Sequence, residues 1–99
     1  MKVELFYFDG CPNWMVARER LAEAVRATGR TDITVGRRRV ETAAEAEAVG
    51  FTGSPTVRFD GRDPFATGSE QVGLACRVYT TPDGLGGSPT VVQFMEVLS

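Results

Sequence analysis

Cys11 is the residue of this sequence whose surroundings best suit chemistry. It follows an apolar stretch at residues 5–8 and the turn dipeptide Asp9-Gly10, and it precedes Pro12, which suits a first helical position because proline lacks the N–H that would be unpaired there. A thiol at the start of a helix faces free backbone N–H groups and the positive end of the helix dipole. Both favour the thiolate, which attacks disulfides and binds soft metal ions. Cys11 is therefore the predicted reactive group.

The composition predicts one ordinary globular domain that spans residues 1–99. Hydrophobic residues make up 42% of the chain and charged residues 24%, and the formal net charge is -2. This slight negative charge argues against nucleic acid as the main partner. The sequence has no histidine, which excludes Ser-His and Cys-His catalytic pairs and removes the commonest metal ligand. We therefore predict no metal site.

We expect a cytoplasmic location by default, since the sequence shows neither a membrane-spanning stretch nor a signal peptide. No apolar stretch is long enough to span a bilayer, so we expect no membrane association. The N-terminal residues have the pattern of a strand rather than of a signal peptide. Two cysteines, Cys11 and Cys76, are too few and too far apart for a disulfide scaffold.

The first half of the chain has a strand–helix–strand pattern. Residues 2–8 form an apolar run typical of a strand, residues 12–28 form an amphipathic helix that Gly29 ends, and residues 32–40 alternate as a second strand. A crossover through a helix makes the two strands parallel. The basic run at residues 37–39 suits an exposed sheet edge.

The second half predicts a short helix, two strands and a last helix. A capping-box pattern opens at Thr42, the helix ends at Gly50, and residues 56–59 alternate as a third strand. After a loop at residues 61–72, residues 74–79 are expected to form a fourth strand. Ser88-Pro89 has the pattern of a helix start, followed by apolar residues at helical spacing.

The expected fourth strand has two distinct faces. Leu74, Cys76 and Val78 lie on one face, which favours burial of Cys76 as a small hydrophobic residue. Arg77 and Tyr79 lie on the opposite face and are expected to be exposed.

The element order predicts an α/β fold, β-α-β-α-β-β-α, with a four-stranded mixed sheet and helices on both faces. This order, with Phe8-Asp9-Gly10-Cys11-Pro12 after the first strand and Gly53-Ser54-Pro55-Thr56 before the third, resembles the thioredoxin superfamily. The resemblance covers essentially the whole chain and is to small bacterial thioredoxin- or glutaredoxin-like proteins.

The resemblance implies that Pro55 is cis and packs beside Cys11. The backbone of Ser54 would then pair with an extended peptide or with glutathione, as in the addition of a strand. Thr56 would hold this segment in place or contact Cys11. The sequence also permits a simpler interpretation, because proline is tolerated at the first residue of many strands.

The sequence departs from the family at the position of the second thiol. Thioredoxins carry Cys-x-x-Cys, whereas this chain has Cys11-Pro12-Asn13-Trp14. Trp14 cannot release a mixed disulfide, so a dithiol mechanism within the motif is excluded. Pro12 and Trp14 remain candidate substrate contacts beside Cys11.

Three functions follow. In the first, Cys11 attacks a protein or small-molecule disulfide, and glutathione or another low-molecular-weight thiol resolves the adduct. In the second, Cys76 is the resolving thiol, which requires Cα atoms within about 7 Å. In the third, the domain is a non-catalytic binding module for a partner protein, through an exposed Phe65 for example, for a thiol ligand, or for a soft metal ion held by Cys11 and Cys76. The sequence gives no indication of the oligomeric state.

Overall fold

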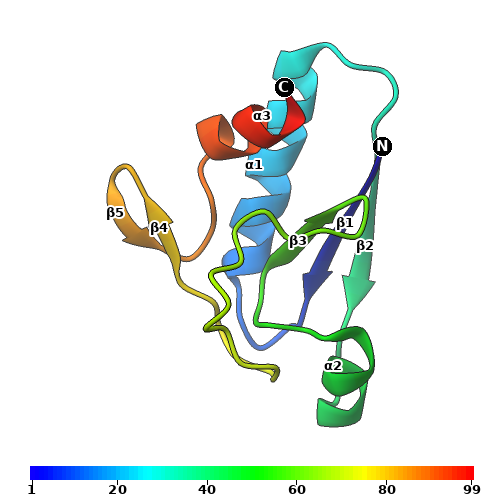
Figure 1. The fold of residues 1–99 in the computed structure, drawn as a ribbon, viewed down its shortest axis with the longest axis vertical. Helices are drawn as coiled ribbons and strands as arrows, with labels where there is room; N and C mark the ends of the chain where they lie inside the picture. Colours follow the sequence, from blue (N-terminus) through cyan, green and yellow to red (C-terminus); the bar gives the residue numbers. More distant parts are fainter.

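The computed structural model describes residues 1–99 and contains three helices and five strands (Figure 1). An α/β fold is confirmed. In chain order the elements are β1 (Lys2–Tyr7), α1 (Asn13–Thr28), β2 (Thr34–Arg39), α2 (Ala43–Val49), β3 (Thr56–Phe59), β4 (Tyr79–Thr81), β5 (Gly84–Gly86) and α3 (Val91–Leu98).

The main sheet has three strands, with β1 between β2 and β3. β1 pairs with β2 in parallel, as predicted for a strand–helix–strand unit, and with β3 in antiparallel orientation, with Leu5 opposite Val57. β2 forms one edge of the sheet, and all six of its residues are exposed. The arginines of β2 therefore lie at an exposed edge, as the sequence predicted.

The expected fourth strand is absent from this sheet. Residues 74–78 form no strand; they contribute a single isolated bridge, between Cys76 and Ser54. Only Tyr79 belongs to a strand, β4, which pairs with β5 in a separate hairpin on the far side of the molecule from β2 (Figure 1). Cys76 pairs with Ser54, which lies before β3 begins, and the chain after Cys76 leaves the sheet. Pairing is therefore limited to this one bridge.

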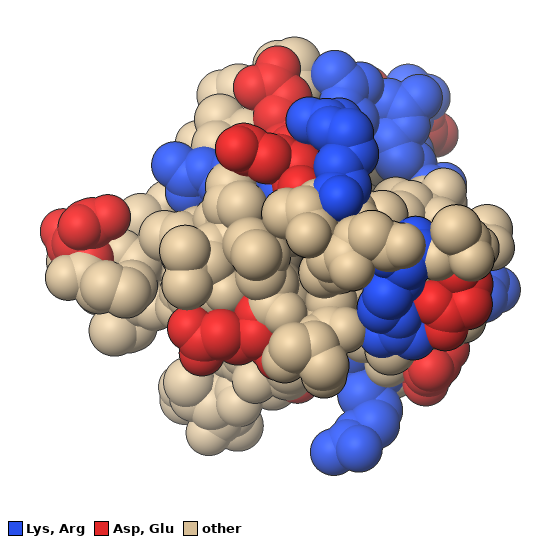
Figure 2. All heavy atoms as spheres, turned by 90° about the horizontal axis from the view of Figure 1, so that it is seen from above, with Lys and Arg blue, Asp and Glu red and all other residues tan.

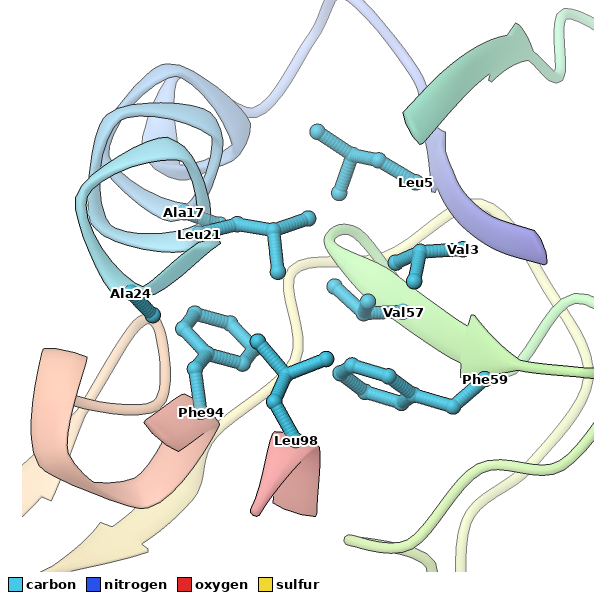
Figure 3. Packing of buried hydrophobic residues seen from close by; sticks show 9 residues of the cluster. All are labelled: Val3, Leu5, Ala17, Leu21, Ala24, Val57, Phe59, Phe94 and Leu98. Carbon is cyan, nitrogen blue, oxygen red and sulfur yellow. The ribbon is translucent and has the colours of Figure 1, made fainter. Parts of the chain in front are cut away.

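The main core lies between one face of the sheet and the helices α1 and α3. Figure 3 shows how its nine side chains meet, with Phe94 and Leu98 of α3 packed against Phe59 of β3 and Leu21 of α1. The full set is Val3, Leu5, Ala17, Leu21, Ala24, Val57, Phe59, Phe94 and Leu98. This packing holds α1, and with it the residues at its N-terminus, in a fixed place beside the sheet.

A smaller cluster covers the other face of β1. Phe6, which points away from the main core because strand side chains alternate, packs with Ala46 of α2, Val40 and Phe51. On this side of the sheet the only buried residue that a helix contributes to the cluster is Ala46 of α2. This cluster also anchors Phe51, which begins the connection from α2 to the segment before β3.

Two helix starts differ from expectation: Pro12 caps α1 instead of occupying its first position, and α3 begins later than predicted. α1 begins directly after Pro12, and Gly29 adopts the left-handed conformation that ends it. Thr42 caps α2 through its side chain, as predicted. α3, however, is capped by Thr90 and not by Ser88: Thr90 and Gln93 form a reciprocal capping box. The true cap lies directly after Pro89, so the prediction was two residues early.

Candidate functional site

Cys11 and Cys76 form a disulfide in the structure. Cys11 directly precedes the residue that caps α1, and Cys76 lies in the connection between β3 and β4, 65 positions later. Their Cα atoms are 5.7 Å apart, within the usual range for a disulfide. The structure thus brings together the two cysteines whose proximity the sequence left open.

The Ser54–Pro55 peptide bond is cis and lies beside this disulfide. The Cys11 Sγ atom is 3.8 Å from the backbone oxygen of Ser54, so the cysteine and the proline segment are neighbours. The structure therefore confirms the cis bond and places Cys11 next to the residue that precedes Pro55.

The backbone of Ser54 is already paired with the protein's own chain. Its N–H donates to the oxygen of Ala75 at 2.8 Å, and its oxygen accepts from the N–H of Arg77 at 3.0 Å. We call residues Ala75, Cys76 and Arg77 the strap. The strap occupies both hydrogen-bonding groups that an extended peptide or glutathione would use.

Burial in the site is uneven between the two cysteines. Cys11 is 0% exposed, as are Ser54 and Thr56, and Pro55 is also fully buried. Cys76, by contrast, is exposed. The prediction of a buried Cys76 was therefore wrong. In the disulfide form Cys76, not Cys11, is the cysteine on the solvent side.

Arg77 is buried, contrary to the sequence prediction. Its Nη1 atom donates to Asp63 at 2.6 Å and lies 3.3 Å from the hydroxyl oxygens of both Thr52 and Thr56. Its guanidinium also lies over the ring of Tyr79, 4.6 Å from the centroid. An arginine is buried only when it is paired in this way. The strap is inverted relative to the predicted strand because its charged side chain finds partners inside.

Tyr79 fixes the chain directly after the strap. Its side chain is buried, and its hydroxyl donates to the backbone oxygen of Pro55. Burial raises the pKa of the Tyr79 phenol above its ordinary value, so it remains a neutral donor at physiological pH. The strap and Tyr79 thus contact three consecutive residues at the start of β3: Ser54, Pro55 and Thr56.

Trp14 packs away from the strap. Its ring stacks on that of Tyr7 with centroids 4.1 Å apart, and the guanidinium groups of Arg18 and Arg37 lie over it. Trp14 therefore joins α1 to the end of β1 and to β2. Pro12 is exposed, next to the buried Cys11.

A cleft of about 300 Å³ borders the exposed side of the disulfide. It is lined by Thr52, Gly53, Ser69, Glu70, Gln71, Ala75, Cys76, Arg77 and Val78. Hydrogen bonds from Thr67 lower the pKa of Glu70, so a carboxylate faces this cleft at neutral pH. A somewhat larger cleft, of about 340 Å³, lies between α1 and the β4–β5 hairpin, away from both cysteines. Of these two clefts, only the one at Cys76 is lined by a cysteine.

Comparisons of the chain with models of protein families, with curated proteins and with solved structures found no match. The case for a function therefore depends on the geometry of the site.

Other kinds of site receive little support from the structure. It contains no group of three or more histidine, cysteine, aspartate or glutamate residues that could hold a metal ion. None of the helices is long and apolar enough to cross a membrane. On the end of the molecule drawn in Figure 2, basic and acidic side chains lie next to one another, without a continuous field of one sign. Phe65 is half-buried against Tyr79 and Phe94, which corrects the expectation of an exposed apolar contact.

Proposed function

We propose that this protein is a thioredoxin-like thiol–disulfide oxidoreductase in which Cys11 is the nucleophile and Cys76 the resolving thiol. The observation that carries the proposal is the Cys11–Cys76 disulfide itself, formed beside Ser54 and Pro55 at the start of α1. Such a pair performs the task of a Cys-x-x-Cys motif with the second thiol supplied by a distant segment.

The reaction balances with these two sulfurs alone. In the reduced protein, the Cys11 thiolate attacks a partner's disulfide, which forms a mixed disulfide and releases the partner's other sulfur as a thiolate. The Cys76 thiolate then attacks the Cys11 sulfur and releases the partner's first sulfur as a second thiolate. The partner's disulfide is reduced to two thiols, and the Cys11–Cys76 disulfide is formed.

Regeneration uses Cys76, the exposed cysteine of the pair. A thiolate of a small thiol such as glutathione reaches Cys76 through its cleft and attacks that sulfur, and Cys11 leaves as a thiolate at the positive end of the α1 dipole. A second small thiol then releases Cys76 from the mixed disulfide. The buried position of Cys11 directs this attack to Cys76.

The geometry favours this reaction over a non-catalytic binding module. The two cysteines are bonded to each other, which is one of the two states that the exchange reaction requires, and no group of three or more potential metal ligands lies around them. If the protein works in the cytoplasm, as its sequence leads us to expect, a disulfide there is usually transient and catalytic. The position of Trp14 agrees with this mechanism, since Trp14 packs on Tyr7 and has no resolving role to perform.

Equilibration with glutathione buffers tests the proposal. We expect the Cys11–Cys76 pair to exchange reversibly, with a reduction potential in the range of exchange proteins, roughly −120 to −270 mV. The fraction reduced is measured by alkylation of free thiols and mass spectrometry, with Cys11→Ser and Cys76→Ser as controls that cannot form the pair. A potential below about −300 mV would mark the disulfide as purely structural and contradict the proposal.

A further inference from the structure

The strap holds the site as a bound peptide would. A backbone oxygen at Ala75 and a backbone N–H at Arg77 flank Cys76 and pair with Ser54, and Cys76 itself is bonded to Cys11. The arrangement therefore has the form of a mixed disulfide with a three-residue extended segment, in which the segment belongs to the same chain. The chemistry of this internal occupant describes what the site accepts.

We propose that the strap is a displaceable occupant of a recognition site for extended polypeptide segments in which arginine directly follows the reactive cysteine. This inference rests on the proposed function, because it names the class of disulfide that Cys11 attacks. It adds a specificity that thiol exchange alone does not require.

The arginine socket belongs to the body of the protein. Its members are Thr52, which lies before β3, Thr56, which is the first residue of β3, and Asp63. All three contact the Nη1 atom of Arg77. Asp63 is held independently of the strap, since its Oδ1 atom accepts the N–H of Phe65 at 3.0 Å. Phe65 in turn packs on Phe94 of the core. The socket is thus built to remain when the strap leaves.

The strap fits this socket imperfectly. The Nη2 atom of Arg77 is buried and has no hydrogen-bond partner. A buried donor without an acceptor weakens the hold of the segment that carries it. The unpaired donor reduces the free energy that Arg77 contributes to holding the strap, so less is lost when the strap leaves the socket.

The exchange is balanced in atoms and electrons. The Cys11 thiolate attacks the partner's cysteine sulfur, and the partner's other sulfur leaves as a thiolate. The returning strap then brings the Cys76 thiolate to the Cys11 sulfur, and the partner's cysteine leaves as a thiolate while the strap takes back the socket. Release of the product and formation of the Cys11–Cys76 disulfide are one event.

A trapping experiment tests the specificity. The probe is a synthetic peptide with the sequence of residues 72–79, its cysteine joined by a disulfide to thionitrobenzoate, a good leaving group that directs attack to the peptide sulfur. The protein is the reduced Cys76→Ser/Arg77→Ala variant, whose socket is empty. Cys11 forms the mixed disulfide with the peptide, and the released thionitrobenzoate is followed by absorbance.

Two matched peptides separate the contacts. In the first, citrulline replaces arginine; citrulline is neutral and has nearly the same shape. In the second, the backbone nitrogen of the arginine is methylated, so the peptide lacks the N–H that pairs with Ser54. We expect each to react about tenfold more slowly than the parent peptide. With Asp63→Asn added to the protein, the preference for arginine over citrulline should fall to about twofold or less.

The outcomes distinguish a site without selectivity for arginine from a protein without the proposed function. The site is not selective for arginine if the parent and citrulline peptides react equally, or if the preference survives Asp63→Asn. A second control is the mixed disulfide of glutathione and thionitrobenzoate. If Cys11 reacts neither with it nor with any of the peptides, although the free thiol is detected in urea, both the proposed function and the specificity fail. Circular dichroism checks the fold of each variant, and Cys76→Ser, which keeps its own arginine, serves where Arg77→Ala does not fold. In Cys76→Ser we expect slower trapping of the same peptide, because the strap competes for the socket.

Discussion

When reduced Cys76→Ser protein reacts with two peptides joined by a disulfide, we expect one of the peptides to remain on Cys11 as a covalent adduct. One peptide is released as a thiol, and the other remains bound because no second sulfur reaches the mixed disulfide. The wild-type protein, under the same conditions and without added thiol, releases both peptides as thiols and forms the Cys11–Cys76 disulfide. Mass spectrometry of the protein distinguishes a peptide adduct from an internal disulfide.

The matching control is Cys11→Ser, which should release neither peptide, since the nucleophile is missing. If Cys11→Ser carried the adduct on Cys76 instead, the assignment of the two roles would be reversed. If Cys76→Ser released both peptides without an external thiol, Cys76 would have no resolving role.

Asp63→Asn will lower the free energy of unfolding by about 3 kcal/mol, because it leaves the guanidinium of Arg77 buried without its counter-charge. The pair is almost completely enclosed, with side-chain exposures of 4% for Arg77 and 13% for Asp63. Urea unfolding of the disulfide-bonded protein measures the change. The asparagine is similar in shape to the aspartate, so the loss reports charge rather than packing.

The double variant Asp63→Asn/Arg77→Met provides the control for this prediction. Removal of both charges should recover part of the stability that the single variant loses, since no buried charge is then unpaired. A loss below about 1 kcal/mol for Asp63→Asn would show that the threonine hydroxyls alone hold Arg77 and that Asp63 contributes little to the socket.

Local patterns in the sequence predicted much of the fold. The start of α1 after Cys11, its end at Gly29, the cap of α2 at Thr42 and the exposed edge strand β2 all follow from signals within a few residues. The family resemblance added the neighbourhood of Cys11 and Pro55, which no local pattern contains.

The strap could not be predicted because its partners are distant in sequence. Leu74, Cys76 and Val78 alternate like the buried face of a strand, yet Val78 is 66% exposed and Arg77 only 5%. The orientation is decided by Asp63, Thr52 and Thr56, which lie 14 to 25 positions before Arg77. Asp63 itself occurs in a stretch with the composition of a loop, so nothing marks it as the partner of a buried arginine.

Amide hydrogen exchange at Arg77 shows whether the strap can leave the site, because the Arg77 N–H donates to the Ser54 oxygen that a partner would need. If reduction of the disulfide frees the strap, exchange at this amide should become at least about tenfold faster in the reduced protein, since the cross-link no longer restricts opening. Amides of β1, which exchange through global unfolding, serve as the reference for the general loss of stability on reduction. Equal exchange at Arg77 in the two redox states would mean that the strap is a permanent part of the fold, and the account would be contradicted.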